Sequence, residues 1–395
     1  MNTNLPFLEI ECCQLNKMGQ SVCGDDFQWA RLENENRHIA VLSDGLGSGI
    51  KANLLANMTT TMALRFMRSN MDILQSAETI MDSLPVCEVR KISYATFSMV
   101  DIHDEGKTRI IEMGNPTYIH LRGTEEILPE GHSQLISQRW PDREMEVWST
   151  SLQLGDRLVI CSDGVTQAGL GQQRFKFGWR RQGCLEFIQK KLFQMPEMSA
   201  RELSECVSSE ALFIDPQKKC RDDISCLVIY YRRPRTLRLL TGPPFHREDD
   251  ARFASLAVSG ADQVIVCGGT TANILNRELH TQVSINMKRI RGDDSLPPPG
   301  MMKGVGLTTE GILTLTRVAS DLESGNWENA PEAAKEIIEK LLASDCIEFI
   351  VGTKVNEAHQ DPSLPIDLEI RRNIVKRLKE ILVNRYRKNV EIMYI

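Results

Sequence analysis

Two stretches of the sequence end an apolar, strand-like run with an aspartate and a glycine. Residues 40–45 read Ala-Val-Leu-Ser-Asp-Gly, and residues 158–164 read Leu-Val-Ile-Cys-Ser-Asp-Gly. The glycine lets the backbone turn without a Cβ clash, so each pattern holds a carboxylate at the edge of a sheet. If the fold brings Asp44 and Asp163 together, the two carboxylates repel each other unless a cation lies between them. The repeated pattern therefore indicates a metal site.

Two further pairs of acids stand at the beginning of apolar runs. Asp25 and Asp26 precede one run, and Asp222 and Asp223 precede residues 226–230. No histidine or cysteine recurs beside them at metal-ligand spacing, and carboxylates alone favour hard ions such as Mg2+ or Mn2+ over Zn2+. Two such ions sharing a carboxylate would lower the pKa of a bridging water and supply a nucleophile for a phosphate ester.

Apolar periodicity predicts the elements that position these acids. We expect strands at residues 8–13, 37–43, 94–101, 108–113, 117–121, 146–152 and 226–230. We expect helices at residues 51–68, 73–84, 185–192 and 200–211. Asp44 then lies in a strand, loop and helix unit, in a region that is otherwise rich in sheet.

A domain boundary is predicted at residues 232–235, where three arginines and a proline end an apolar strand. This divides the chain into domains 1–233 and 236–395. In the second domain we expect strands at residues 263–267 and 346–351, and helices at residues 272–279, 330–343 and 366–386. Alternating strands and helices predict an α/β layered domain.

Composition limits the partners and the location of the protein. Of the 395 residues, 42% are hydrophobic and 25% charged, and the net charge is −6. This acidic balance argues against general binding to nucleic acid or to anionic membranes. The 11 cysteines are scattered and form no Cys-x-x-Cys pair, which favours a reducing cytoplasm over a disulfide framework. We expect neither a signal peptide nor a membrane anchor, because no apolar run approaches membrane-spanning length.

Five motifs, most of which contain the acids above, occur in one order along residues 10–231. In that order they resemble the motifs of the metal-dependent type 2C serine/threonine protein phosphatases, especially the bacterial branch typified by stage II sporulation protein E. The motifs are Cys23-Gly24-Asp25, residues 43–49 (Ser-Asp-Gly-Leu-Gly-Ser-Gly), Gly114-Asn115-Pro116, Leu154-Gly155-Asp156 with Ser162-Asp163-Gly164, and Asp222-Asp223-Ile224-Ser225.

The resemblance implies an α/β/β/α sandwich of two antiparallel sheets with two Mn2+ or Mg2+ ions at one edge. Asp44 would bridge both ions, and Gly45 would offer its backbone carbonyl to one of them. Asp163 and Asp222 would ligate the other ion, and Asp25 would complete the site directly or through water. Asp44 and Asp163 are thus the expected catalytic acids, and water between the ions would attack phosphoserine or phosphothreonine in line.

Two features of this resemblance stay open. Asp26 and Asp223 follow expected ligands, and whether they contact metal is open; in the family that the motifs resemble, the residue after the last acid, here Asp223, usually supports the site rather than ligates the metal. The phosphate-binding arginine near the amino terminus of eukaryotic members has no obvious counterpart. Phosphate binding is therefore expected to depend on the metals.

The expected function is that of a cytoplasmic bacterial protein phosphatase acting on a phosphorylated protein. A pseudophosphatase that serves as an interaction module is a rival, although loss of one of the acids would be its usual sign. A metal-dependent hydrolase of a small phosphorylated molecule is a second rival, which a deep pocket at the domain junction would favour.

The second domain contains one glycine-rich turn of interest. Residues 264–271 read as a strand, a glycine turn and a helix start, which can bind an anion but is more often an ordinary βα turn. An anion site at this glycine turn could also be lined by residues 351–354, His359 and Asp361. We therefore expect this domain to sense a small-molecule ligand or to bind a protein partner.

Overall fold

The structure, a computed structural model, describes residues 6–32, 35–84, 95–141, 144–285, 296–354 and 365–395. The chain forms two compact units, residues 2–233 and residues 234–395. His359 and Asp361 lie outside the described residues.

The amino-terminal unit contains two antiparallel sheets. The first has the strand order β1-β11-β10-β6-β7 and the second the order β2-β3-β4-β5-β9-β8. The strands of the first sheet are β1 (Phe7–Leu15), β6 (Ile119–Arg122), β7 (Glu125–Glu126), β10 (Asp156–Cys161) and β11 (Ile224–Arg232). Those of the second are β2 (Asp26–Leu32), β3 (Arg37–Gly45), β4 (Ala95–His103), β5 (Lys107–Met113), β8 (Gly131–Ile136) and β9 (Glu144–Ser151).

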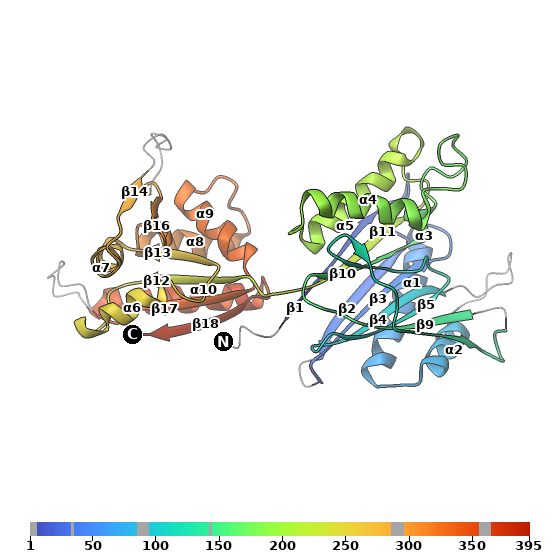
Figure 1. Cartoon of the computed structure of the whole chain (residues 1–395), viewed down its shortest axis with the longest axis horizontal. Helices are drawn as coiled ribbons and strands as arrows, with labels where there is room; N and C mark the ends of the chain where they lie inside the picture. Colours follow the sequence, from blue (N-terminus) through green and yellow to red (C-terminus); the bar gives the residue numbers. More distant parts are fainter. Residues whose placement is uncertain (1–5, 33–34, 85–94, 142–143, 286–295, 355–364) are drawn as a thin grey trace. The chain divides into compact units, whose positions relative to one another are not determined.

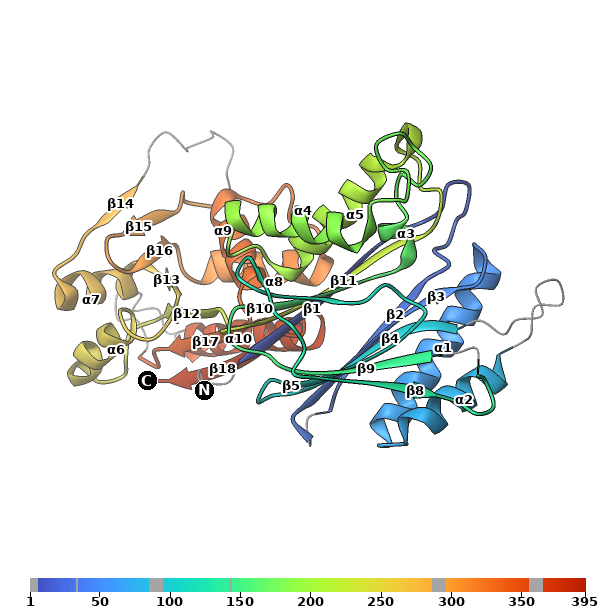
Figure 2. The ribbon, with the colours of Figure 1, turned by 45° about the vertical axis from the view of Figure 1, so that its right-hand side comes forward.

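Helices cover the outer face of each sheet in this unit. Helices α1 (Ile50–Arg68) and α2 (Ile73–Ser83) pack on the second sheet, whereas α4 (Arg180–Gln194) and α5 (Ala200–Ile214) pack on the first (Figure 1). Figure 2 shows the same layers from another direction. Side chains such as Leu42, Val100, Leu158 and Leu227 fill the space between the sheets. The α/β/β/α sandwich expected from the motifs is thus confirmed.

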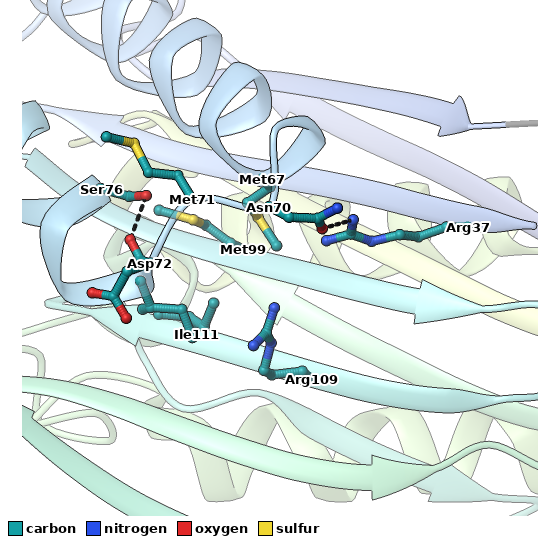
Figure 3. A pocket seen from close by; sticks show the side chains of 10 residues that line it. Arg37, Met67, Asn70, Met71, Asp72, Ser76, Met99, Arg109 and Ile111 are labelled. Atoms are coloured by element: carbon teal, nitrogen blue, oxygen red, sulfur yellow. Dashed lines mark hydrogen bonds between the residues drawn. The ribbon is translucent and has the colours of Figure 1, made fainter. Parts of the chain in front are cut away.

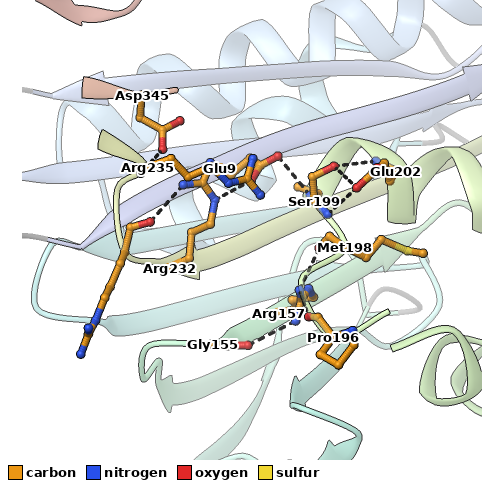
Figure 4. A network of polar contacts seen from close by, with 12 residues as sticks. Glu9, Gly155, Arg157, Pro196, Met198, Ser199, Glu202, Arg232, Arg235 and Asp345 are labelled. Carbon is orange, nitrogen blue, oxygen red and sulfur yellow. Dashed lines mark hydrogen bonds and ion pairs between the residues drawn. The ribbon is translucent and has the colours of Figure 1, made fainter. Parts of the chain in front are cut away.

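Buried polar groups hold α5 against the first sheet. Arg157 is 2% exposed, donates hydrogen bonds of 2.8 Å to the carbonyl oxygens of Pro196 and Met198, and lies over the ring of Tyr230 (Figure 4). Glu9 accepts from the first backbone amide of α5. The loop that leads into α5 is therefore fixed to the strands.

The carboxy-terminal unit is built on a seven-stranded sheet of order β14-β15-β16-β13-β12-β17-β18, in which the last five strands are parallel to one another. The strands are β12 (Thr236–Thr241), β13 (Gln263–Cys267), β14 (Val283–Ile285), β15 (Gly300–Met302), β16 (Gly306–Thr309), β17 (Cys346–Val351) and β18 (Asn389–Tyr394). The helices are α6 (Asp250–Leu256), α7 (Gly269–Leu279), α8 (Ile312–Ser324), α9 (Glu332–Ala343) and α10 (Pro365–Asn384).

Helices cover both faces of this sheet, as expected for an α/β layered domain. Helices α8, α9 and α10 pack on one face, and α6 and α7 pack on the other. Strand β12, which no periodic pattern predicted, lies at the centre. Its apolar run is interrupted by Arg238, which forms an ion pair with Glu348 and donates to two carbonyl oxygens. Among the described helices, none combines the length and apolarity that crossing a bilayer requires.

Candidate active site

Strand register brings the predicted acids to one edge of the sandwich. Strand β2 pairs with β3 so that Asp26 lies opposite Ser43, which puts Asp25 and Asp44 at the same end of the second sheet. In the first sheet, β10 pairs with β11 so that Cys161 lies opposite Cys226. Asp163 follows β10 and Asp222 precedes β11, so both acids lie at one end of this sheet.

The electrostatic effects on Asp44 show that the acids of the two sheets lie close together. Burial, followed by the charges of Asp25 and Asp163, raises the pKa of Asp44 from 3.8 to about 9. A hydrogen bond between the Asp44 and Asp163 side chains also raises the pKa of Asp44, as does the charge of Asp222. For Asp163 itself, burial and then Asp222 raise the pKa. The protein therefore holds several carboxylates in one place, and no cation of the described residues is among the main influences on Asp44 or Asp163.

Asp25 lies inside this edge, where two serines support it. Asp25 is 2% exposed. Burial raises the pKa of its carboxyl group and hydrogen bonds from Ser225 and Ser162 lower it, and the resulting pKa is about 6. Ser225 Oγ donates to Asp25 Oδ2 at 2.7 Å, and Ser162 Oγ accepts from the backbone amide of Ser225 at 3.0 Å. The serine of the first-sheet Ser-Asp-Gly motif and that of the Asp-Asp-Ile-Ser motif thus hold an acid of the second sheet. Sequence analysis quoted both serines but gave them no role.

Lys17 supplies a cation that sequence analysis missed. Its Nζ lies 3.3 Å from Asp222 Oδ1, and its backbone amide donates to Asp223 Oδ1 at 2.9 Å. Asp223 is buried, whereas the Asp222 side chain is half-exposed. The loop after β1 therefore positions both acids at the beginning of β11. A lysine in a polar loop carries no sequence signal that distinguishes it from a solvated one.

Asp26, whose role was open, contacts helix α1. Its Oδ2 accepts from Asn57 Nδ2 at 3.3 Å, from Gln28 Nε2 at 3.3 Å and from the hydroxyl of Thr60. These bonds direct its carboxylate to the helix. Asp26 therefore links α1 to β2.

Gly45 lies where the chain has no room for a side chain. An ideal Cβ at this residue would lie 2.2 Å from the carbonyl oxygen of Ala52 and 2.6 Å from that of Gly24. Thr96 Oγ1 also donates to the carbonyl oxygen of Asp44 at 3.1 Å. The backbone after Asp44 is thus packed tightly between α1 and the loop before β2.

The donor set at this edge fits a hard divalent cation. The five acids Asp25, Asp44, Asp163, Asp222 and Asp223 offer only carboxylate oxygens, and a cation would relieve the repulsion seen at Asp44. In the part of the chain that the structure describes, however, no group of three or more His, Cys, Asp or Glu side chains is arranged to hold a metal ion. The chemistry fits, and metal binding would require these side chains to adjust.

Comparisons with known proteins bear on the same region. The family model of stage II sporulation protein E (SpoIIE) matches residues 34–232, which include Asp44, Asp163 and Asp222. Stage II sporulation protein E of Bacillus subtilis (strain 168) is 27% identical over 151 residues, 38% of this chain and 18% of that protein. The alignment thus spans less than a fifth of the length of that relative.

Two solved structures show similar chains. The PP2C phosphatase domain and a fragment of the regulatory domain of SpoIIE from Bacillus subtilis match with 20% identity, over 58% of this chain and 64% of that one, with a TM-score of 0.46. The SiaA-PP2C domain of Pseudomonas aeruginosa matches with 15% identity, over 55% and 85%, with a TM-score of 0.43. Because the family model takes in half of the sequence, this chain belongs to the stage II sporulation protein E family.

Proposed function

We propose that the amino-terminal unit is a Mn2+- or Mg2+-dependent phosphatase that removes phosphate from phosphoserine or phosphothreonine of a protein, in bacterial cytoplasmic signalling. One observation carries this proposal. Burial and then acids from both sheets raise the pKa of Asp44, and these acids form a concentration of negative charge that a divalent cation would neutralise. The chain belongs to the stage II sporulation protein E family, which suggests hydrolysis of a phosphate ester as the reaction at these acids.

In this proposal Asp25, Asp44, Asp163, Asp222 and the backbone carbonyl of Gly45 hold two ions. When bound, such ions supply a water of low pKa as nucleophile and neutralise charge on the phosphate. The residues around the acids keep these ligands in place.

Four contacts of the chain orient the acids. Ser225 and Ser162 donate to Asp25, and Gln167 Nε2 donates to Asp163 Oδ2 at 2.8 Å. Lys17 holds Asp222. Each neighbour occupies part of a carboxylate and leaves its remaining lone pairs for a ligand.

Two rival functions remain as alternatives. A pseudophosphatase would be expected to lose an acid of the site, whereas Asp44, Gly45, Asp163 and Asp222 are all present. A hydrolase of small phosphorylated molecules is the second rival, and a deep pocket at the junction of the two domains would favour it.

Hydrolysis by the full chain tests the proposal. We expect p-nitrophenyl phosphate and a phosphothreonine peptide to be hydrolysed with Mn2+ or Mg2+ and not with a chelator. Asp44→Asn and Asp163→Asn should each lower kcat by at least about a hundredfold, the scale set by removal of one group that acts in the transition state. The exposed Glu105→Gln serves as a control of equal charge change and should keep full activity. Metal-independent hydrolysis, or full activity in both aspartate variants, would overturn the proposal.

We also propose that residues 236–395 sense a small-molecule ligand or bind a protein partner. In this sheet the connections run to one side of β12 through β13 and β16, and to the other side through β17 and β18. Ligands of open α/β sheets bind at such a switch point, beyond the carboxyl ends of the strands. Titration of the full chain with ATP and with inorganic phosphate tests this. Binding that Gly268→Ala abolishes would favour a ligand at the α7 turn, since Gly268 has a φ of +107°.

A further inference from the structure

A cavity of about 290 Å3 lies in the amino-terminal unit, at the carboxyl end of α1. It is bounded by the turn between α1 and α2 and by strands β3, β4 and β5 (Figure 3). Its apolar wall is formed by Met67, Met71, Ile73, Met99 and Ile111. Its size is close to the lower limit of small-molecule sites, which combine such apolar walls with a few polar groups.

Two arginines stand at the polar end of the cavity, and Asp101 holds both. Arg37 Nε and Nη2 donate to the two oxygens of Asp101 at 2.6 Å and 2.9 Å, and its Nη1 donates to Asn70 Oδ1. Arg109 Nη2 donates to Asp101 Oδ2 at 3.1 Å. Asp101 is buried and so fixes both guanidinium groups at one place.

The two arginines differ in how many of their guanidinium N–H donors have a partner among the described residues. Arg37 is buried, and its three nitrogens all have partners. Arg109 has a side chain that is 45% exposed, and within the described part of the chain its one polar partner is Asp101. Figure 3 shows its guanidinium rising from β5 toward Met67 and Met99. Arg109 therefore presents N–H donors beside an apolar wall.

We propose that this cavity binds a small aliphatic carboxylate, with the carboxylate on Arg109 and the hydrocarbon body against the methionines. A guanidinium recognises a carboxylate through paired hydrogen bonds, and methionine side chains adapt to an aliphatic body. A single charge suits the site, because Asp72 and Asp101 already place two carboxylates near it. A dianionic phosphate has only the unpaired donors of one guanidinium to neutralise it.

The ligand would stabilise helix α1 at one end, while the other end supports the acids. Asn53 in the first half of α1 donates to the carbonyl oxygen of Cys23 at 2.9 Å, and Asn57 and Thr60 donate to Asp26. Fixing the carboxyl end of α1 is therefore expected to slow opening of residues 50–60. This expectation does not depend on phosphatase activity.

Methyl NMR of the full chain tests the proposal directly. In protein labelled at the methionine methyl groups, sodium hexanoate should shift the signals of Met67, Met71 and Met99. The signals of Met301 and Met302 in the other unit should stay unchanged and serve as references. Hexanamide has the same body without the charge and should bind at least about tenfold more weakly, the scale of a charge-assisted hydrogen bond.

Variants separate recognition from folding. Arg109→Gln should weaken hexanoate binding about tenfold, whereas Arg109→Lys, which keeps the charge but loses the paired hydrogen bonds, should bind with intermediate affinity. Met71→Trp keeps the guanidinium but fills the cavity, so it should also abolish the shifts. Unchanged signals of Met113 and Met145, which are buried in the amino-terminal unit outside the cavity lining, show that this unit is folded in each variant. The absence of shifts in the wild-type protein, or equal shifts with hexanamide or in Arg109→Gln, would overturn the site. Hydrogen exchange at residues 50–60 that hexanoate does not slow would overturn its link to α1.

Discussion

Replacing Asp44 by asparagine should stabilise the amino-terminal unit when no metal is bound. Burial, together with Asp25 and Asp163, raises the pKa of Asp44 from 3.8 to about 9. A carboxyl group with a higher pKa in the folded chain binds its proton more tightly when folded. Its contribution to stability is therefore complete below its unfolded pKa and is lost as the pH rises toward the folded value. Asparagine keeps the shape of the side chain and has no charge to lose.

The magnitude follows from the pH interval. Each unit of pH between the two pKa values changes the free energy of unfolding by about 1.4 kcal/mol for one proton. Between pH 5 and pH 7 the wild-type protein should thus lose up to about 2.7 kcal/mol of stability from Asp44 alone. In Asp44→Asn this pH-dependent loss of the free energy of unfolding should be absent.

Urea unfolding in excess chelator measures the difference. Four of the five tryptophans lie in the amino-terminal unit, so a Trp327→Phe background makes tryptophan fluorescence report on that unit alone. The exposed Glu105→Gln is the control, and its stability should follow the pH dependence of the parent protein. An equal pH slope in Asp44→Asn and in the parent would refute the electrostatic argument.

Bound Mn2+ should make the parent protein more stable than Asp44→Asn. At a Mn2+ concentration about one hundred times Kd, the parent protein should gain about 2.7 kcal/mol, because the ion binds only the folded state. Asp44→Asn should gain little, since it lacks the acid expected to bridge the ions. An equal gain in both proteins would show that Mn2+ binds elsewhere.

Three further predictions concern single contacts. Gly45→Ala should destabilise the amino-terminal unit by about 3 kcal/mol or more in urea unfolding, because its Cβ would lie 2.2 Å from a backbone oxygen of α1. Gly131→Ala is the control and should have little effect, because its Cβ would have no neighbour closer than 3.7 Å. Asp26→Ala should cost about 1–3 kcal/mol through lost hydrogen bonds to α1 and speed hydrogen exchange there; unchanged exchange would contradict its link to α1. Arg238→Met should destabilise the carboxy-terminal unit by about 2–3 kcal/mol, followed by Trp327 fluorescence, and adding Glu348→Met should restore most of the loss if the unpaired charge is the cause.

Periodic apolar patterns and recognisable turns predicted many strands and helices of the amino-terminal unit, and the resemblance of its motifs to the type 2C phosphatases implied how they are layered. The acids were found for the same reason, since a carboxylate before glycine at the end of an apolar strand is a local signal. Ser225 and Lys17 act through contacts between segments about 200 residues apart. Such contacts depend on the register of the sheets, which no local pattern states.

In the carboxy-terminal unit, the sequence pattern failed to predict a buried strand. Its central strand β12 contains Arg238, so the apolar run looks too short to be a buried strand. The structure resolves this because Glu348 and two carbonyl oxygens satisfy the guanidinium within the fold. Whether a charge can be buried is decided by partners from distant parts of the chain, so polarity alone gave the wrong signal.

The cluster of acids makes a proton and a divalent cation competitors for Asp44. Without a cation, the least costly state of Asp44 at neutral pH is the protonated one, in which a hydrogen bond joins it to Asp163. A proton and a divalent ion are then alternative ways of neutralising the same charge. Because a ligating carboxylate must release its proton, metal affinity should rise with pH toward about 9, the pKa of Asp44. The repulsion that destabilises the metal-free unit is in this way the source of its affinity for the ion.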